Sequence, residues 1–212
     1  LRRVLSLIAI EGVVGVGKTS LMEILVSEGY TPFEEPVIDN PILEKFYHNR
    51  KRYSFPLQVF FLNRRFEQLR AASKLNNVVM DRSIYGDAIF AKLLNENNEL
   101  SDIEYNIYEE LFDNMIQFTK SPKLIVYLEA STDEAIKRIN MRGRDYEQEV
   151  ERDYWENLNH KYNDFFNNYS MSPIIRINVE NLDFKNNTKD KEYVVSLIKD
   201  KLKDLEENID EK

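Results

Sequence analysis

Near its amino terminus the chain reads Gly12-Val13-Val14-Gly15-Val16-Gly17-Lys18-Thr19-Ser20, which contains G-x-x-x-x-G-K-[ST] without a mismatch. The apolar run Val4–Ile10 precedes it with the length of a buried strand, and a helical apolar pattern begins at Leu21. In such a strand–loop–helix unit, backbone N–H groups point inward and the helix N-terminus adds partial positive charge. We therefore predict a phosphate-binding loop in which Lys18 reaches the outer phosphates and Thr19 faces Mg²⁺. The alternative, a turn that binds nothing, is disfavoured by these flanking segments.

The rest of the chain alternates short apolar runs with longer helical patterns. Further strands are expected near residues 30–33, 77–80, 123–128 and 174–179. Helices are expected up to about residue 27, near residues 41–48, 55–75, 86–95, 103–119, 131–141 and 151–168, and from about residue 190. Ser101 to Glu104 and Ser131 to Glu134 have the spacing of capping boxes at two helix starts. Strands separated by helices predict an α/β protein with a mostly parallel, five-stranded sheet flanked by helices on both faces.

The composition narrows the class of protein. With 212 residues, 42% of them hydrophobic, the chain has the length for one domain spanning residues 1–212. Its formal net charge of −8 argues against a nucleic-acid partner, and no apolar run reaches the roughly 18 residues of a membrane span. The absence of cysteine disfavours disulfides and thiolate metal sites, and only His48 and His160 are available for histidine chemistry. We expect a cytoplasmic protein, without a leader, that binds a small anionic ligand.

Polar side chains directly follow the predicted second and third strands. Ligands gather at the carboxyl ends of strands in sheets of this kind. Asp81 and Arg82 follow the third strand, and there a carboxylate can hold Mg²⁺ while a guanidinium neutralises phosphate. A surface ion pair is the alternative reading of these two residues. Glu34 and Glu35 follow the second strand before Pro36, a sensible place for the base that a phosphoryl acceptor needs, although such acids are also ordinary loop chemistry.

A small arginine cluster follows the predicted fourth strand. Arg138 and Arg142 are four residues apart and share one face of a helix, and Arg144 comes just after the helix terminator Gly143. Three guanidinium groups converging from a helix end and a loop can clamp a transferring phosphoryl group and exclude water. The alternative is that they pair with the neighbouring acids Asp145, Glu147 and Glu149.

Together these motifs resemble the deoxyribonucleoside kinases, the family of the deoxycytidine, deoxyguanosine and bacterial deoxyadenosine kinases. The resemblance covers the chain from the first strand to about His160 and is closest to the bacterial deoxyadenosine kinases. It rests on motifs in the family's order: Gly12–Thr19, Glu35-Pro36, Tyr47, Tyr53-Ser54-Phe55 before Gln58, Arg65, Asp81-Arg82-Ser83, Asp87, and Arg142-Gly143-Arg144-Asp145-Tyr146-Glu147-Gln148. It implies a P-loop kinase fold with an arginine-rich lid at about residues 142–150.

The resemblance also implies roles for single residues. Glu35 resembles the general base that takes the proton from the nucleoside 5′-hydroxyl, with Arg82 beside it. The implied phosphate clamp consists of Lys18, Arg138, Arg142 and Arg144, and the implied magnesium ligands are Thr19 and Asp81. The implied deoxynucleoside contacts are Tyr47 and Glu147 to the sugar 3′-hydroxyl, Gln58 to the base edge, Arg65 and Asp87 near an exocyclic amino group, and Phe90 as a stacking face.

The base pocket departs from the deoxycytidine kinase pattern. Asn40 stands where that enzyme has an aromatic residue, Leu57 replaces a phenylalanine before Gln58, and the segment after Asp87 is one residue shorter. These changes fit a roomier pocket for a purine, and they are similar to the bacterial deoxyadenosine kinases.

The resemblance implies ATP-dependent phosphorylation of the 5′-hydroxyl of deoxyadenosine, with dG and dC as weaker substrates and Mg²⁺ as cofactor. It further implies a homodimer packed through helices near residues 55–75 and 103–119. Two alternatives stay open at this point. A nucleoside monophosphate kinase of the thymidylate kinase type would need extra basic residues for the acceptor phosphate. A non-catalytic nucleotide-sensing module would not need Lys18, Glu35 and Arg82 together.

Overall fold

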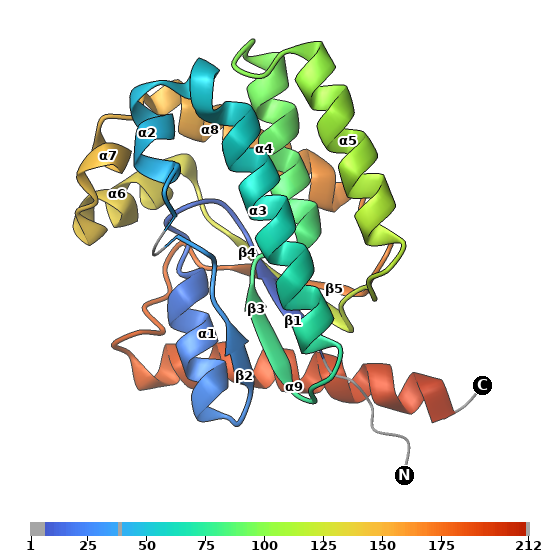
Figure 1. Ribbon diagram of the computed structural model, residues 1–212. Helices are drawn as coiled ribbons and strands as arrows, with labels where there is room; N and C mark the ends of the chain where they lie inside the picture. The colour runs from blue at the N-terminus through green and yellow to red at the C-terminus, as the bar shows by residue number, and fades with distance from the viewer. Residues whose placement is uncertain (1–6, 38–39, 211–212) are drawn as a thin grey trace.

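The computed structural model describes residues 7–37 and 40–210 and has a five-stranded sheet at its centre (Figure 1). The strands are β1 (Leu7–Glu11), β2 (Thr31–Phe33), β3 (Val78–Asp81), β4 (Leu124–Glu129) and β5 (Ile174–Asn178). They are parallel and lie in the order β2-β3-β1-β4-β5. The predicted parallel sheet is confirmed, and the phosphate loop leaves it from the central strand. The first strand was expected from Val4, but Val4–Ser6 lie outside the described residues.

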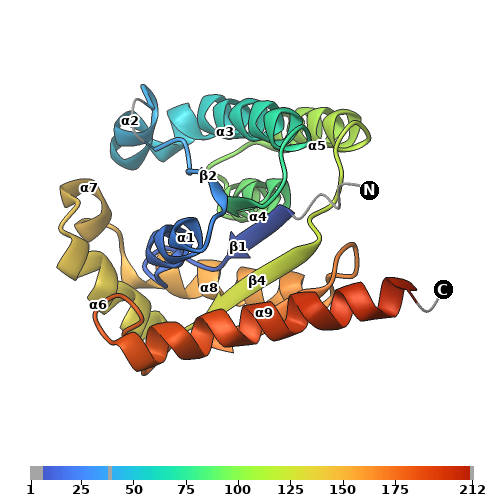
Figure 2. The same cartoon turned by 90° about the horizontal axis from the view of Figure 1, so that it is seen from below.

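Helices cover both faces of this sheet. They are α1 (Lys18–Ser27), α2 (Leu43–His48), α3 (Arg50–Ala72), α4 (Ile84–Glu96), α5 (Asp102–Ile116), α6 (Thr132–Arg142), α7 (Asp145–Gln148), α8 (Arg152–Asn167) and α9 (Thr188–Asp210). Figure 2 shows the strands between α9 on one side and α3 and α5 on the other. Within the described ranges no helix is both long and apolar enough to cross a bilayer.

The core follows from the apolar strands. Ile8, Ala9 and Ile10 of β1 are fully buried, as expected for the middle strand of a parallel sheet covered on both faces. One apolar cluster joins β1 and β4 to α1, α8 and α9. A second cluster joins β3 to α3, α4 and α5. The sheet is therefore held between two apolar layers, and its carboxyl edge is left to polar residues.

The third helix begins at Arg50, earlier than the predicted start near Phe55. Asn49 caps it, because the Asn49 side-chain oxygen accepts a hydrogen bond from the Arg52 N–H at 3.2 Å. The Arg50 guanidinium also lies 4.1 Å from the centre of the Tyr154 ring on α8. This tertiary contact is not visible in local sequence, and the early start leaves Pro56 inside the helix.

The two predicted capping boxes have different outcomes. Ser101 and Glu104 form the complete reciprocal pair at the start of α5, which confirms the first. At the start of α6, the Ser131 hydroxyl does accept from the Glu134 N–H at 3.2 Å. The reciprocal bond, from the Ser131 N–H to the Glu134 carboxylate, was predicted wrongly. The Ser131 N–H donates instead to the carboxylate of Glu180 at 2.7 Å. A residue that follows β5 therefore caps a helix that follows β4.

Candidate active site

The phosphate loop is tightly packed against its neighbours. Gly12 and Gly15 have φ values of 142° and 90°, a region that disfavours side chains. A Cβ atom at Gly12 would lie 2.6 Å from the Leu128 carbonyl oxygen, and one at Gly15 would lie 2.5 Å from the Ala135 carbonyl oxygen. The loop pattern thus requires glycine here for its backbone conformation and for close approach to β4 and α6.

Lys18 lies at the start of α1 and turns back over the loop. Its ammonium group donates to the Val13 carbonyl oxygen at 2.9 Å, and the residue is only 6% exposed. Burial lowers the pKa of Lys18 to about 8, and the positive charge of Arg82 acts in the same direction. The carboxylates of Asp81 and Glu35 oppose this shift. An anion close to the Lys18 ammonium group would favour its charged form.

Thr19 and Asp81, which were predicted to face a metal ion, are in direct contact. The Thr19 hydroxyl donates to Oδ2 of Asp81 at 2.9 Å, and Oδ1 of Asp81 is buried without a hydrogen-bond partner. Hydroxyl and carboxylate oxygens are the ligands that Mg²⁺ prefers, and Mg²⁺ in such sites completes its shell with phosphate and water. The pair fits Mg²⁺ in that form. Among the described residues no group of three or more metal-binding side chains exists to hold an ion by protein ligands alone.

Arg82 lies at the centre of the polar edge. Its Nε donates to Oε1 of Glu35 at 2.6 Å, one Nη donates to the Gly12 carbonyl oxygen at 3.1 Å, and the same nitrogen contacts the Tyr162 hydroxyl. Its guanidinium carbon lies 4.9 Å from the centre of the Phe90 ring. The side chain is therefore held from four directions and presents Glu35 to the cavity.

The Glu35 carboxylate keeps about a quarter of its surface exposed. Burial alone would raise its pKa, but the charges of Arg82, Lys18 and Arg65 and the hydrogen bond from Arg82 outweigh burial and lower the pKa. Glu35 is accordingly ionised near neutral pH. An ionised carboxylate at the edge of a cavity can accept a proton from a hydroxyl group.

Sequence reasoning missed Glu11, the last residue of β1. Its side chain is fully buried, and Oε1 accepts from the Ser83 N–H at 2.6 Å and from the Ser83 hydroxyl at 2.5 Å. Burial raises the pKa of Glu11, against the charge of Arg82 and the bonds from Ser83. Arg82, between Asp81 and Ser83, has a left-handed φ of 72°. Glu11 thus stabilises the turn that aims Arg82, and an acid directly before the phosphate loop was a readable signal.

Tyr162 on α8 was also missed, and local sequence gave no signal for it. The residue is fully buried, and burial raises the pKa of its phenol well above the usual value. Its ring packs edge-on against Phe90 at 5.9 Å. The hydroxyl therefore stays protonated and can accept from Arg82. Only the packing of α8 against α4 brings these side chains together.

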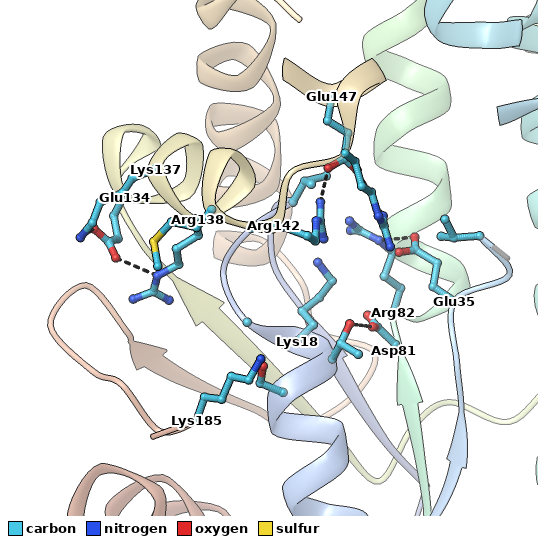
Figure 3. A pocket seen from close by; sticks show the side chains of 18 of the residues that line it. Lys18, Glu35, Asp81, Arg82, Glu134, Lys137, Arg138, Arg142, Glu147 and Lys185 are labelled. Atoms are coloured by element: carbon cyan, nitrogen blue, oxygen red, sulfur yellow. Dashed lines mark hydrogen bonds and ion pairs between the residues drawn. The ribbon is translucent and has the colours of Figure 1, made fainter. Parts of the chain in front are cut away.

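The three predicted clamp arginines separate into two groups. Arg138 donates to the backbone oxygens of Val16, Val179 and Leu182 at 3.2, 2.7 and 3.4 Å and pairs with Glu134 at 2.8 Å. Figure 3 shows it beside Glu134, on the far side of the cavity from Arg82. In this structure its donors are therefore directed to protein oxygens.

Arg142 and Arg144 both bind Glu147, at 2.5 and 3.2 Å. The carboxylate of Glu147 is only 4% exposed, whereas each arginine keeps more than a third of its surface, 36% and 37%. Pairing of these arginines with a neighbouring acid, weighed from the sequence, thus occurs, with Glu147 as the partner. Arg142 also extends towards Lys18 in Figure 3. Both guanidinium groups remain available to an anion in the cavity.

Of the predicted nucleoside residues near the base, Gln58, Asp87 and Phe90 line the cavity, and Arg65 lies behind Asp87. Gln58 is 3% exposed, and Arg65 and Asp87 form a buried ion pair at 3.2 Å. Burial raises the pKa of Asp87 in spite of Arg65. Phe90 covers the guanidinium of Arg82, and its exposed edge reaches the cavity. Asn40, in place of an aromatic residue, accepts from the N–H groups that begin α2.

One cavity of about 1080 Å³ brings most of these residues together. It is lined by Val14, Gly15, Gly17, Lys18, Thr19, Ser20, Glu35, Tyr47, Gln58, Asp81, Arg82, Asp87, Phe90, Arg138, Arg142, Arg144 and Glu147. The predicted residues Gly12, Val13, Val16 and Arg65 are not part of its lining. They lie behind the lining and contact residues that belong to it, namely Lys18, Arg82, Arg138 and Asp87.

Sheet order, phosphate loop and arginine-bearing lid are together those of a P-loop phosphotransferase. A family model described as deoxynucleoside kinase matches residues 8–203. The chain belongs to the deoxynucleoside kinase family. This membership favours the first of the three functions considered from the sequence and disfavours a monophosphate kinase or a mere sensing module.

Individual relatives agree with that assignment. A deoxyguanosine kinase of Lactobacillus johnsonii is 38% identical over 211 residues, covering 95% of this chain and 94% of the relative. A deoxyadenosine kinase of Dictyostelium discoideum is 43% identical over 175 residues, covering 81% and 71%. The solved structure of deoxyadenosine kinase from M. mycoides with bound dATP superposes with a TM-score of 0.80 at 34% identity, covering 91% of this chain and 99% of that one.

Proposed function

We propose that the protein transfers the γ-phosphoryl group of ATP to the 5′-hydroxyl of deoxyadenosine, with dG and dC as weaker substrates. The observation that carries this proposal is the ionised Glu35 held by Arg82 in the same cavity as Lys18. Relatives named deoxyadenosine, deoxyguanosine and deoxyadenosine/deoxycytidine kinase support the substrate class. The departures at Asn40 and Leu57 support a purine.

The proposed reaction uses groups of this chain at each end of the new bond. Glu35 takes the proton of the 5′-hydroxyl as that oxygen forms a bond to the γ-phosphorus. The bond from this phosphorus to the bridging β,γ-oxygen breaks, and ADP leaves. Lys18, Arg142 and Arg144 bind the oxygens on which negative charge collects. Mg²⁺, held by Thr19 and Asp81 with phosphate oxygens, would supply further charge neutralisation.

Tyr47 and Glu147 are proposed to bind the sugar 3′-hydroxyl, and Gln58 the edge of the base. Both 3′-hydroxyl ligands come from outside the sheet, on α2 and α7. The deoxyribose would then lie between α2 and α7. This order puts the 5′-carbon towards Glu35.

A homodimer in the cytoplasm completes the proposal. On α5, Tyr108 is the buried residue, while Ile103 and Ile107 are 74% and 44% exposed and Phe118 beyond it is 79% exposed. Apolar side chains gathered on one helix face favour a protein contact.

The proposed protein is a single domain, because both apolar clusters pack against the same sheet.

Replacing Glu35 by glutamine tests the reaction. We expect E35Q to lower kcat for deoxyadenosine by about 100-fold or more, because the general base is lost, while ATP binding survives. Glu34→Gln is the matched control, since Glu34 is exposed and its side chain is not part of the cavity lining. Steady-state rates with the four deoxynucleosides and with dAMP as acceptor complete the assay. Equal turnover by E35Q and wild type, or no turnover of any purine deoxynucleoside by wild type, would end the proposal.

A further inference from the structure

The short helix α7 brings an aromatic ring of the lid onto the helix that carries Tyr47. The rings of Tyr146 and Tyr47 are stacked, with centroids 5.0 Å apart and planes at 29°. The two helices pack against each other although they are far apart in sequence. Stacked aromatic pairs at this distance attract beyond their buried area. The contact therefore restrains the ring of Tyr47 from the lid side.

Tyr146 directly precedes Glu147, the other proposed ligand of the sugar 3′-hydroxyl. Glu147 is fixed by Arg142 and Arg144, and the Tyr146 phenol lies within reach of Arg144. Burial raises the pKa of Tyr47 well above its usual value, and Tyr154 and Glu147 nearby add to the shift. The Tyr47 phenol thus stays protonated and can donate a hydrogen bond, while the Glu147 carboxylate can accept one. The short helix α7 thus carries both Glu147 and the Tyr146 ring that packs against Tyr47.

We propose that Tyr146 is a positioning residue for the sugar site: its ring fixes that of Tyr47 and thereby sets the preference for substrates that carry a 3′-hydroxyl. The inference rests on the proposed function. Without the stack, the Tyr47 ring is free to rotate away from Glu147, and the 3′-hydroxyl loses one of two partners. Contacts to the base and to the 5′-hydroxyl remain, because Gln58 and Glu35 belong to other elements.

The test compares deoxyadenosine with 2′,3′-dideoxyadenosine, which lacks the 3′-hydroxyl. The kcat/KM ratio of the two substrates is measured for wild type, Tyr146→Leu and Tyr146→Phe. We expect Y146L to lower the ratio of deoxyadenosine to dideoxyadenosine about three- to tenfold, the range of a lost aromatic contact. The fall should come from a lower kcat/KM for deoxyadenosine, with that for dideoxyadenosine unchanged. Y146F keeps the ring and should keep the wild-type ratio. Gln148→Ala, an exposed change in the same helix, is the control for local disturbance.

The outcomes separate the inference from the function on which it rests. If Y146L lowers kcat/KM for both substrates by the same factor, Tyr146 is merely structural and the inference is overturned. An unchanged ratio in Y146L also overturns it, with the proposed function intact when wild type phosphorylates deoxyadenosine. If wild type phosphorylates neither substrate, the proposed function fails and the inference fails with it. Thermal unfolding of each variant verifies that the comparison is made on folded protein.

Discussion

Lys18 is a buried base whose charge depends on the occupant of the cleft. With burial and Arg82 lowering its pKa to about 8, it is only partly protonated at that pH. A triphosphate placed against the ammonium group favours the charged form and raises the pKa. We therefore expect ATP binding to be accompanied by proton uptake in this pH range.

This uptake is measurable by calorimetry. At pH 8 we expect ATP binding to take up close to half a proton, because a group titrating at its pKa is about half protonated. The observed enthalpy should then depend on the ionisation enthalpy of the buffer. Lys18→Arg is the matched variant, since arginine is charged throughout this range. Equal buffer dependence in wild type and K18R would contradict the assignment.

Four site residues could be placed from local sequence patterns alone, without the family resemblance. The phosphate loop places Lys18 and Thr19, and the ends of β2 and β3 place Glu35 and Arg82, because strand ends of a parallel sheet meet at one edge. Tyr162 has no such pattern, since its place beside Arg82 depends on how α8 packs. The same holds for the ring contact between Tyr146 and Tyr47.

At the scale of elements, Gly86 explains how closely α4 approaches β1. A Cβ atom there would lie 2.8 Å from both carboxylate oxygens of Glu11. In an open helix, glycine to alanine stabilises by about 0.5–1 kcal/mol. At this site we expect Gly86→Ala to destabilise by about 1–3 kcal/mol, the usual cost of overpacking, and to lower kcat by shifting Arg82. Urea unfolding measures the first effect.

Lys92→Ala serves as the control for Gly86→Ala, since Lys92 is exposed on the same helix. It should leave the free energy of unfolding within about 0.5 kcal/mol of wild type. A stabilised Gly86→Ala protein with normal turnover would show that Glu11 moves aside at no cost.

Arg138 fastens α6 to two other parts of the site. Its guanidinium holds the oxygens of Val16 in the phosphate loop and of Val179 and Leu182 after β5. We expect Arg138→Met to raise the KM for ATP by about tenfold, the scale of one or two lost charge-assisted bonds, and to increase hydrogen exchange in residues 179–186. A direct role in the phosphoryl clamp would instead appear mainly in kcat, with exchange unchanged. Asn140→Ala, exposed on the same helix and not part of the cavity lining, is the control.

Helix boundaries illustrate what the sequence left open. Ser101 and Glu104 are neighbours in one turn, so their reciprocal bonds could be read from spacing alone. Ser131 has the same spacing, yet Glu180 takes the place of Glu134 because β5 lies beside β4. The early start of α3 is likewise accompanied by a contact between elements, that of Arg50 with the Tyr154 ring on α8. Local rules predicted the strands and the helices other than α7, a short helix in a segment expected to be a loop, whereas contacts between elements set several of their ends.

At the scale of the whole molecule, the exposed face of α5 makes oligomerisation testable. Ile103 and Ile107 are one helical turn apart and share a face. We expect wild type to sediment as a dimer at micromolar concentration and Ile107→Glu to sediment as a monomer, because a charge would be buried in the contact. Met171→Glu, at a site 50% exposed away from α5, should remain dimeric. Sedimentation of wild type as a monomer would dismiss the proposed homodimer.

The attachment of α6 limits how the site can open. Glu180 binds the first residue before this helix and Arg138 fastens its middle, so we expect any opening movement to be confined to the last turn of α6 and to α7. Gly143, whose φ of 74° suits glycine, joins the last turn of α6 to α7. One helical turn measures about 5.4 Å, so the moving arm is short. We therefore expect nucleotides to enter and leave through a small displacement near Arg142, while the walls around the phosphate loop keep their shape.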